Sequence, residues 1–148
     1  MPKARLALTS DLDSILDSFE QSQVSAVVKP IENARRIWVS TLAQEGLSLF
    51  VSSENSKVVA TCMLITASNL LREGRKHGFI ENVVTHGNYK CRGHGSAVLQ
   101  AALQKAWTDG CFHVLIQSGR QDPDVHRFYE GNGFEGGLRI GYVARSPA

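Results

Sequence analysis

Two glycines one residue apart, Gly93 and Gly95, separate an apolar run at 79–85 from an amphipathic segment that ends before Gly110. Glycine adopts backbone conformations that other residues avoid, and it leaves room for a ligand close to the main chain. The first amides of a helix have no partner within the helix and lie at the positive end of its dipole, where phosphates bind. The pair alone is equally compatible with a tight turn that only packs a strand on a helix. The chain must in either case contain a strand, a tight turn and a helix in this order.

Hydrophobic periodicity extends this pattern over the whole chain. A breaker-rich, basic stretch at 69–78 predicts an exposed loop. The expected strands span 4–8, 47–52, 57–66, 79–85, 112–116 and 138–143. The expected helices follow a Thr9 or Ser10 cap, run from Ile31 to Gly46, follow Gly95, and run from an Asp122 cap to Tyr129. Since apolar residues occupy both faces of 79–85, helices should cover both sides of the sheet. The prediction is an α/β fold, a single layered domain over 1–148 with a central mixed β-sheet and helices on both faces.

Composition excludes several classes of function. The length of 148 residues suits one hydrophobic core, and a net charge of +2 with scattered basic residues does not indicate a nucleic-acid groove. No stretch approaches the roughly 20 apolar residues that cross a bilayer, and the N-terminus lacks the apolar run of a signal peptide, so we expect a cytoplasmic protein without a membrane partner. The cysteines and histidines lack metal-ligand spacing, so we expect no metal and reduced thiols.

The loop does not match two familiar phosphate-binding motifs. A dinucleotide fingerprint requires a third small residue where Val98 stands, and a Walker loop requires Gly-Lys-Ser/Thr. The loop instead resembles the acetyl-CoA loop of the GNAT superfamily, Gln/Arg-x-x-Gly-x-Gly/Ala at the start of a helix. It departs at Lys90, which keeps the charge but loses planar bidentate donors, and at His94, where an apolar residue is common and where we expect a solvated side chain. The resemblance implies cofactor contacts from Lys90, Cys91, Arg92, Gly93, His94, Gly95 and Ser96.

Two further segments support this resemblance. The run 80–85 is similar to the central strand of the family, and 127–134 resembles its Phe-Tyr-x-x-x-Gly-Phe signature. In the family this strand parts from the next one, and the pantetheine arm of acetyl-CoA pairs with its main chain. The resemblance therefore implies that Val83 and Val84 contact the cofactor through their backbone, while their side chains pack in the core.

Acetyl transfer from a thioester to an amine requires a neutral amine and a leaving thiolate that is protonated or stabilised. The resemblance makes Tyr129 the candidate acid, because a phenol with a reference pKa of about 10 is still protonated at neutral pH. The alternative is an aromatic pair with Phe128 that packs a helix.

Glu81 is the candidate base, because burial in an apolar strand favours a carboxylate that accepts a proton. A solvated carboxylate paired with Arg75 or Lys76 is the alternative. Asn82 either orients the substrate or satisfies the backbone.

The acceptor is left open as a small-molecule primary amine. The runs 80–84 and 110–113 look like the glucosamine-6-phosphate N-acetyltransferases, and the basic stretch at 72–77 suits a sugar phosphate. The sequence is also compatible with a non-catalytic acyl-CoA-binding regulatory module and with an interaction domain that has no cofactor. Because family members often pair through late strands, we also expect a homodimer.

Overall fold

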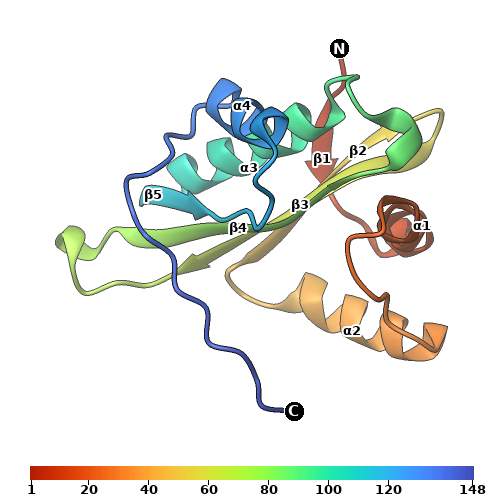
Figure 1. Cartoon of the computed structure of the whole chain (residues 1–148). Helices are drawn as coiled ribbons and strands as arrows, with labels where there is room; N and C mark the ends of the chain where they lie inside the picture. The colour runs from red at the N-terminus through yellow and green to blue at the C-terminus, as the bar shows by residue number, and fades with distance from the viewer. The chain divides into compact units, whose positions relative to one another are not determined.

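Five strands form one mixed β-sheet in the computed structural model, which describes residues 1–148 (Figure 1). Their order in the sheet is their order in the sequence. The strands are β1 Ala4–Leu6, β2 Leu47–Glu54, β3 Lys57–Ala67, β4 Lys76–Thr85 and β5 Cys111–Ile116. Strands β1 to β4 pair antiparallel with one another, and β5 pairs parallel with β4. The predicted α/β class with a mixed sheet is confirmed.

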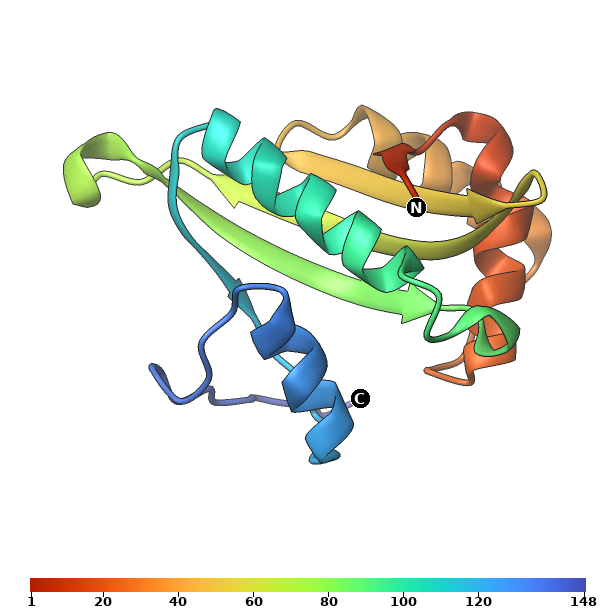
Figure 2. The same ribbon diagram turned by 90° about the horizontal axis from the view of Figure 1, so that it is seen from above.

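Helices cover both faces of the sheet, as expected. The helices on the sheet are α1 Leu12–Ser22, α2 Ile31–Ala43 and α3 His94–Thr108. Adjacent strand residues point to opposite faces. Val51 of β2 packs in a cluster with Leu12 and Trp38, whereas Ser52 contacts His94 at the start of α3. Figure 2 shows α3 across the face opposite α1 and α2. None of the helices combines the length and the hydropathy needed to span a bilayer.

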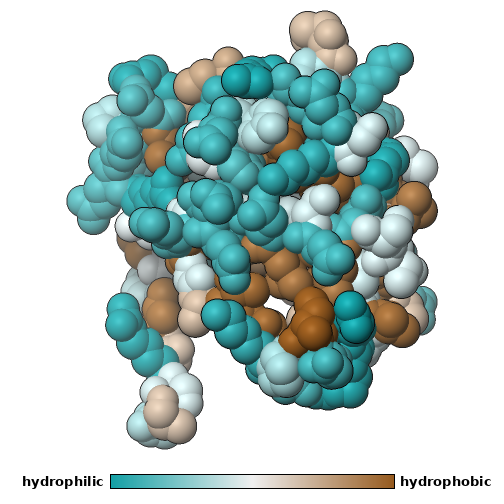
Figure 3. All heavy atoms as spheres, turned by 90° about the vertical axis from the view of Figure 1, so that its right-hand side faces the viewer, coloured by the Kyte–Doolittle hydropathy of each residue, from teal (hydrophilic) through white to brown (hydrophobic).

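The side of the molecule on which α1 and α2 lie is mostly hydrophilic, with hydrophobic residues gathered in the lower part of the view (Figure 3). Ile37 and Val39 of α2 are exposed, while Ala34 and Trp38 on the same helix are buried. The buried pair belongs to the stripe that helical periodicity marks, and the exposed pair lies off it.

The chain divides into two compact units, residues 1–116 and 117–148. The first contains the sheet and α1 to α3, and the second contains α4, Pro123–Gly131. Asp122 caps α4 as expected, because its carboxylate accepts a hydrogen bond of 2.9 Å from the amide of Asp124. The single domain over 1–148 stays a prediction.

The expected strand at 138–143 is wrong. This segment forms no strand, and its large apolar side chains are exposed. They are Leu138, Ile140, Tyr142 and Val143. Alternating hydrophobicity fits a strand, but a strand forms only where it pairs with another strand, and none pairs here.

The expected loop at 69–78 is also partly wrong, because β4 begins at Lys76. Gly78, predicted as a breaker, lies inside the sheet between Thr66 of β3 and Val114 of β5. A Cβ atom there would lie 3.1 Å from the carbonyl oxygen of His113. Gly78 thus permits close approach of a neighbouring strand rather than ending one.

The expected Thr9 or Ser10 cap of α1 is replaced by a 3₁₀ turn over Thr9–Asp11. Asp11 accepts a hydrogen bond of 2.7 Å from the amide of Leu8 and pairs with Arg5 at 2.8 Å. Asp11 is itself the N-cap residue of α1, but its side chain accepts no hydrogen bond from the amides of this helix. The predicted hydroxyl cap is therefore wrong.

Candidate active site

A β-bulge interrupts β4 at the residues predicted to contact cofactor and substrate. Glu81 pairs with Met63 and Val84 with Thr61, so Asn82 and Val83 together oppose a single residue of β3. Asn82 has a φ of 53°, in the left-handed region that asparagine tolerates better than most residues. A bulge bends its strand and increases the local twist. It therefore turns the second half of β4 away from the course of the first half.

Beyond this point β4 has no neighbouring strand on its β5 side. The parallel pairing runs from Lys76–Cys111 to Ile80–Ile116 and ends there. The edge of β4 from Glu81 to Thr85 thus presents main-chain groups that a ligand can use in place of a strand.

The loop that follows β4 ends in a sharp turn at the start of α3. Cys91 and Gly93 have φ values of 63° and 90°. Gly93 is the N-cap of α3, and no side chain caps this end of the helix. The amides of the first helical turn then face outward without an intrahelical acceptor. Helix N-termini without a side-chain cap are places where anions can bind, and phosphate binding at this one stays a prediction.

One anchor of the loop is His94, the first residue of α3. Its Nδ1 lies 2.7 Å from the Ser52 hydroxyl, and its Nε2 lies 2.9 Å from Oε2 of Glu54. The other carboxylate oxygen of Glu54 accepts a hydrogen bond of 2.9 Å from Arg92. The pKa of Glu54 is lowered, first by the His94 hydrogen bond and then by the charge of Arg92. One carboxylate on β2 thus holds two residues of the loop.

A second anchor lies at the beginning of the loop. His86 is buried, and its Nδ1 accepts a hydrogen bond of 3.1 Å from the amide of Asn88. Its Nε2 therefore carries the proton and faces Oδ2 of Asp17 on α1 at 3.4 Å. Lys57 pairs with the same oxygen at 2.5 Å and is the main cause of the lowered pKa of Asp17.

The cations of the loop differ in how they are held. The guanidinium of Arg92 lies 5.1 Å from the ring centroid of Tyr89 in addition to its bond with Glu54. Lys90 is exposed and takes part in none of the ion pairs of the structure. Lys90 is thus the cation whose charge remains uncompensated for a phosphate.

Tyr129 lies on α4 of the second unit. Its ring centroid is 5.2 Å from that of Phe128 and 6.0 Å from that of Phe134. Its carbonyl accepts hydrogen bonds from the amides of Asn132 and Phe134 at the end of the helix. The ring therefore has a packing role within this unit, which is the alternative that the sequence offered and which is compatible with a reactive hydroxyl.

Comparison with known families agrees with this geometry. The family model described as the acetyltransferase (GNAT) family matches residues 12–134. The chain belongs to this family. It is therefore an acyltransferase, and the resemblance seen in the glycine loop is confirmed.

Individual GNAT relatives cover most of the chain. A putative acetyltransferase from Agrobacterium tumefaciens is 37% identical, with a TM-score of 0.90 over 97% of this chain and 99% of that one. Glucosamine 6-phosphate N-acetyltransferase of Trypanosoma brucei brucei is 25% identical over 88% of this chain and 86% of its own length. The glucosamine-6-phosphate N-acetyltransferase of Arabidopsis thaliana has a TM-score of 0.82 at 20% identity, over 100% of this chain and 99% of that one. At this identity the similarity supports a shared fold and nothing more.

Within this GNAT fold two of our expectations about side chains are wrong. Glu81 is exposed, so the burial that favoured it as a base is absent. His94 is only 4% exposed, and both ring nitrogens are engaged, so it is not a solvated loop residue. Asn82 is exposed at the bulge, and its backbone conformation gives it a structural reason to be asparagine.

The residues that sequence reasoning missed are the partners of the loop. Ser52, Glu54 and Asp17 lie on β2 and α1, far from the loop in sequence. Each is a polar residue with no motif around it in the sequence, so the sequence alone does not indicate its contact with the loop.

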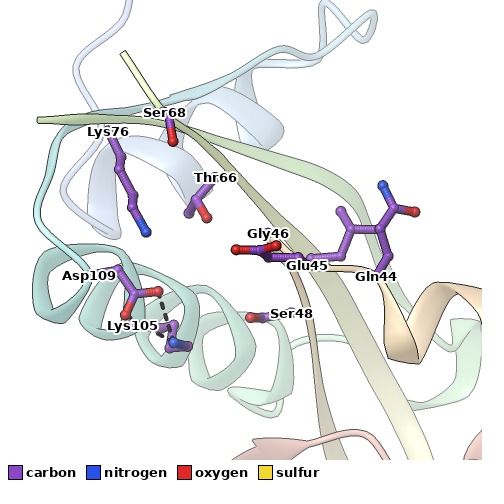
Figure 4. Close-up of a pocket in the computed structure, with 10 residues that line it drawn as sticks. Gln44, Glu45, Gly46, Ser48, Thr66, Ser68, Lys76, Lys105 and Asp109 are labelled. Carbon is purple, nitrogen blue, oxygen red and sulfur yellow. Dashed lines mark hydrogen bonds and ion pairs between the residues drawn. The ribbon is translucent and has the colours of Figure 1, made fainter. Parts of the chain in front are cut away.

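A polar cavity of about 530 Å³ lies at the opposite end of α3 (Figure 4). Lys76, Thr66 and the ion pair of Lys105 with Asp109 contribute to its wall. None of the predicted catalytic or cofactor-binding residues lines it, although Lys76 belongs to the basic stretch predicted to suit a sugar phosphate. Since α3 has 15 residues, its two ends are roughly 20 Å apart. This cavity is therefore separate from the uncapped N-terminus of the helix.

Proposed function

We propose that this chain transfers the acetyl group of acetyl-CoA to a primary amine of a small molecule, by direct attack within a ternary complex. The observation that carries the proposal is the uncapped, glycine-containing N-terminus of α3 next to the unpaired edge of β4. Both features offer main-chain groups near the end of β4. The family to which the chain belongs uses acetyl-CoA.

The residues present fit a pyrophosphate and a pantetheine arm. The amides of His94, Gly95 and Ser96 suit the phosphate oxygens, with Gly93 providing the turn and Lys90 an exposed charge. Cys91 and Arg92 shape the same loop. Val83 and Val84 offer backbone groups to the amides of the arm. These assignments are supported by the geometry of unit 1–116 and by the family resemblance.

The chemistry divides between two side chains. Acetyl-CoA supplies an activated thioester, whose carbonyl carbon forms a new bond with the amine nitrogen while its bond to sulfur breaks. We assign Tyr129 to protonate the leaving sulfur. We assign Glu81 to accept the proton that the amine loses, directly or through water. Asn82 is assigned to orient the acceptor.

A thiol-release assay tests this function. Purified chain and acetyl-CoA are supplied with a panel of small amines, aminosugars and aminoglycosides, and free CoA thiol is measured. The proposal requires release that depends on an amine and yields the N-acetylated product. Tight binding of acetyl-CoA with no release across the panel favours the non-catalytic acyl-CoA-binding module instead.

Glucosamine 6-phosphate is the acceptor that one observation favours, because the Trypanosoma relative carries that name and matches over most of its length. In this chain Arg75 donates to the carbonyl of Cys111 and Arg72 stacks on Phe112. Lys76 is therefore the cation of the basic stretch left for a sugar phosphate. A preference for glucosamine 6-phosphate over glucosamine that Lys76→Ala abolishes supports this acceptor, and equal turnover of both sugars contradicts it.

We further propose a homodimer that acts in the cytoplasm. The exposed apolar residues Leu138, Ile140, Tyr142 and Val143 provide a surface that a second copy can cover. The free thiols, with Cys91 exposed, suit a reducing compartment. Light scattering at increasing protein concentration should give twice the monomer mass. A monomer mass at high concentration would contradict the proposed dimer. Fractionation of the source cells tests the compartment.

A further inference from the structure

We propose that Glu54 is a positioning residue for cofactor binding, which sets the N-terminus of α3 by holding His94 and Arg92 with its two carboxylate oxygens. This inference rests on the proposed binding of acetyl-CoA at that helix end. Nothing in the family resemblance involves Glu54, which is the last residue of β2 and bonds to two side chains of the loop, His94 and Arg92.

The hairpin gives Glu54 a fixed place. β2 ends at Glu54, β3 begins at Lys57, and the two residues between them, Asn55 and Ser56, have φ values of 53° and 64°. Two positive φ angles make a type I′ turn, which matches the twist of the flanking strands. Glu54 itself pairs with Lys57 in the strand register. Its carboxylate is therefore presented from the sheet rather than from a mobile loop.

The contact with His94 is the stronger half of this arrangement. A carboxylate only accepts hydrogen bonds, so Nε2 of His94 is the donor at 2.9 Å. Ser52, whose side chain is buried, engages the other ring nitrogen at 2.7 Å. The ring is held at both nitrogens, and it belongs to the first residue of the helix that carries the proposed phosphate amides. Because both nitrogens are held, the ring restrains the position of the backbone to which it is attached.

The contact with Arg92 is weaker alone, since the side chain of Arg92 is 51% exposed and exposed ion pairs contribute little. Its role is geometric. Arg92 lies between Cys91 and Gly93, both of which adopt left-handed backbone conformations. Such conformations persist where surrounding contacts fix them. Arg92, the residue between Cys91 and Gly93, is fixed by its contact with the ring of Tyr89 and by its bond to Glu54.

The charge of Glu54 and its positioning role should have opposite effects on the affinity for an anionic ligand. A negative carboxylate close to a phosphate site repels an anionic ligand, so removing it should strengthen binding if charge alone matters. If position matters, removing it should weaken binding despite the loss of repulsion. Replacement by glutamine separates the two, because glutamine loses the charge but keeps an oxygen that accepts a hydrogen bond from His94.

The experiment measures CoA affinity by calorimetry for the wild type and four variants. Glu54→Ala should bind roughly 10-fold more weakly, the loss expected for hydrogen bonds to a charged group. Glu54→Gln should stay within about 3-fold of wild type, which is less than one such bond is worth. Ser52→Ala keeps every charge and should weaken binding through the same ring. Glu45→Ala removes an exposed carboxylate at the other end of α3 and should change nothing.

Two readouts separate positioning from loss of stability. The KM for acetyl-CoA should rise in Glu54→Ala while kcat is unchanged. The Nε2 proton of His94 should give an imidazole NMR signal protected from exchange in wild type and Glu54→Gln but not in Glu54→Ala. Wild-type affinity in Glu54→Ala, or tighter binding, overturns this inference alone. Absence of CoA binding by the wild type refutes the proposed cofactor site and this inference with it.

Discussion

The loop between β4 and α3 and the helix α4 differ in the kind of function proposed for them. In the loop the proposed contacts come from the main chain, and the side chains of His86, Arg92 and His94 serve to hold that main chain in place. On α4 the proposed contribution is one phenol hydroxyl on Tyr129, whose ring packs between Phe128 and Phe134.

This difference determines what a substitution can remove. Main-chain binding is insensitive to most side-chain changes, and it is lost when a side chain fills the space above the amides or when the loop changes shape. A side-chain acid is lost with a single atom while the packing of its ring survives. The loop should therefore control affinity and α4 should control turnover.

The largest expected effect is on α4. Tyr129→Phe keeps the ring and deletes only the hydroxyl, so folding and acetyl-CoA affinity should persist. Turnover should fall by roughly 100-fold to 10,000-fold, the range for general acid catalysis, where chemistry limits the rate. Calorimetry and thiol release on the same sample check the split. Unchanged turnover would assign the acid role to water or to another residue.

A smaller effect, on affinity, is expected in the loop. Gly95→Val places a branched side chain among the proposed phosphate amides, while glycine is the poorer helix former, so the fold should survive. Acetyl-CoA affinity should fall by about 10-fold to 100-fold, as for the loss of one or two hydrogen bonds to a charged group.

Gly119→Val is the matched control for this loop variant, because Gly119 has open space around it and no positive φ. It should bind acetyl-CoA like the wild type. A folded Gly95→Val variant with wild-type affinity would show that the phosphate assignment is wrong.

Glu81→Gln tests whether β4 also contributes to turnover, in addition to the contribution proposed for α4. Because Glu81 is exposed, water can replace it in part, and the turnover loss at neutral pH should be roughly ten-fold, below the usual range for a base. The defect should shrink as rising pH deprotonates the amine in solution. The kcat profile against pH distinguishes this from a constant defect, which would make Glu81 a positioning group.

The smallest effect is expected at the anchor around His86, at the beginning of the loop. Asp17→Asn removes the charge that faces Lys57 and His86, at a site exposed enough that the stability loss should be at most about 1 kcal/mol. The folded-state pKa of Asp17 is lowered, mainly by Lys57. The carboxylate therefore stabilises the fold above its unfolded pKa of about 3.9, and this contribution is lost as pH falls through the lower folded value.

Thermal unfolding measured from pH 3 to 8 checks this prediction. The difference in Tm between wild type and Asp17→Asn should be constant above about pH 5 and should shrink as the pH falls below about 4. A difference that grows with acidity would contradict the assigned sign.

The sequence predicted those features that depend on neighbours along the chain. Gly93 indicated the tight turn before α3, and Asp122 indicated the cap of α4. It did not predict features that depend on partners from elsewhere. Glu54 reaches its partners across 38 and 40 residues, and the start of β4 depends on pairing with β3 and β5. The prediction for 138–143 failed for the same reason, because alternation cannot report whether a partner strand exists.

The proposed function depends on the cofactor binding at the N-terminus of α3. A titration of the ¹⁵N-labelled chain with CoA tests this binding, because amide shifts report where the phosphates bind. The largest shifts should fall on the amides of Cys91 to Ser96, followed by those of Val83 and Val84. Shifts confined to Gly46, Lys105 and Asp109, at the cavity on the opposite end of α3, would contradict it.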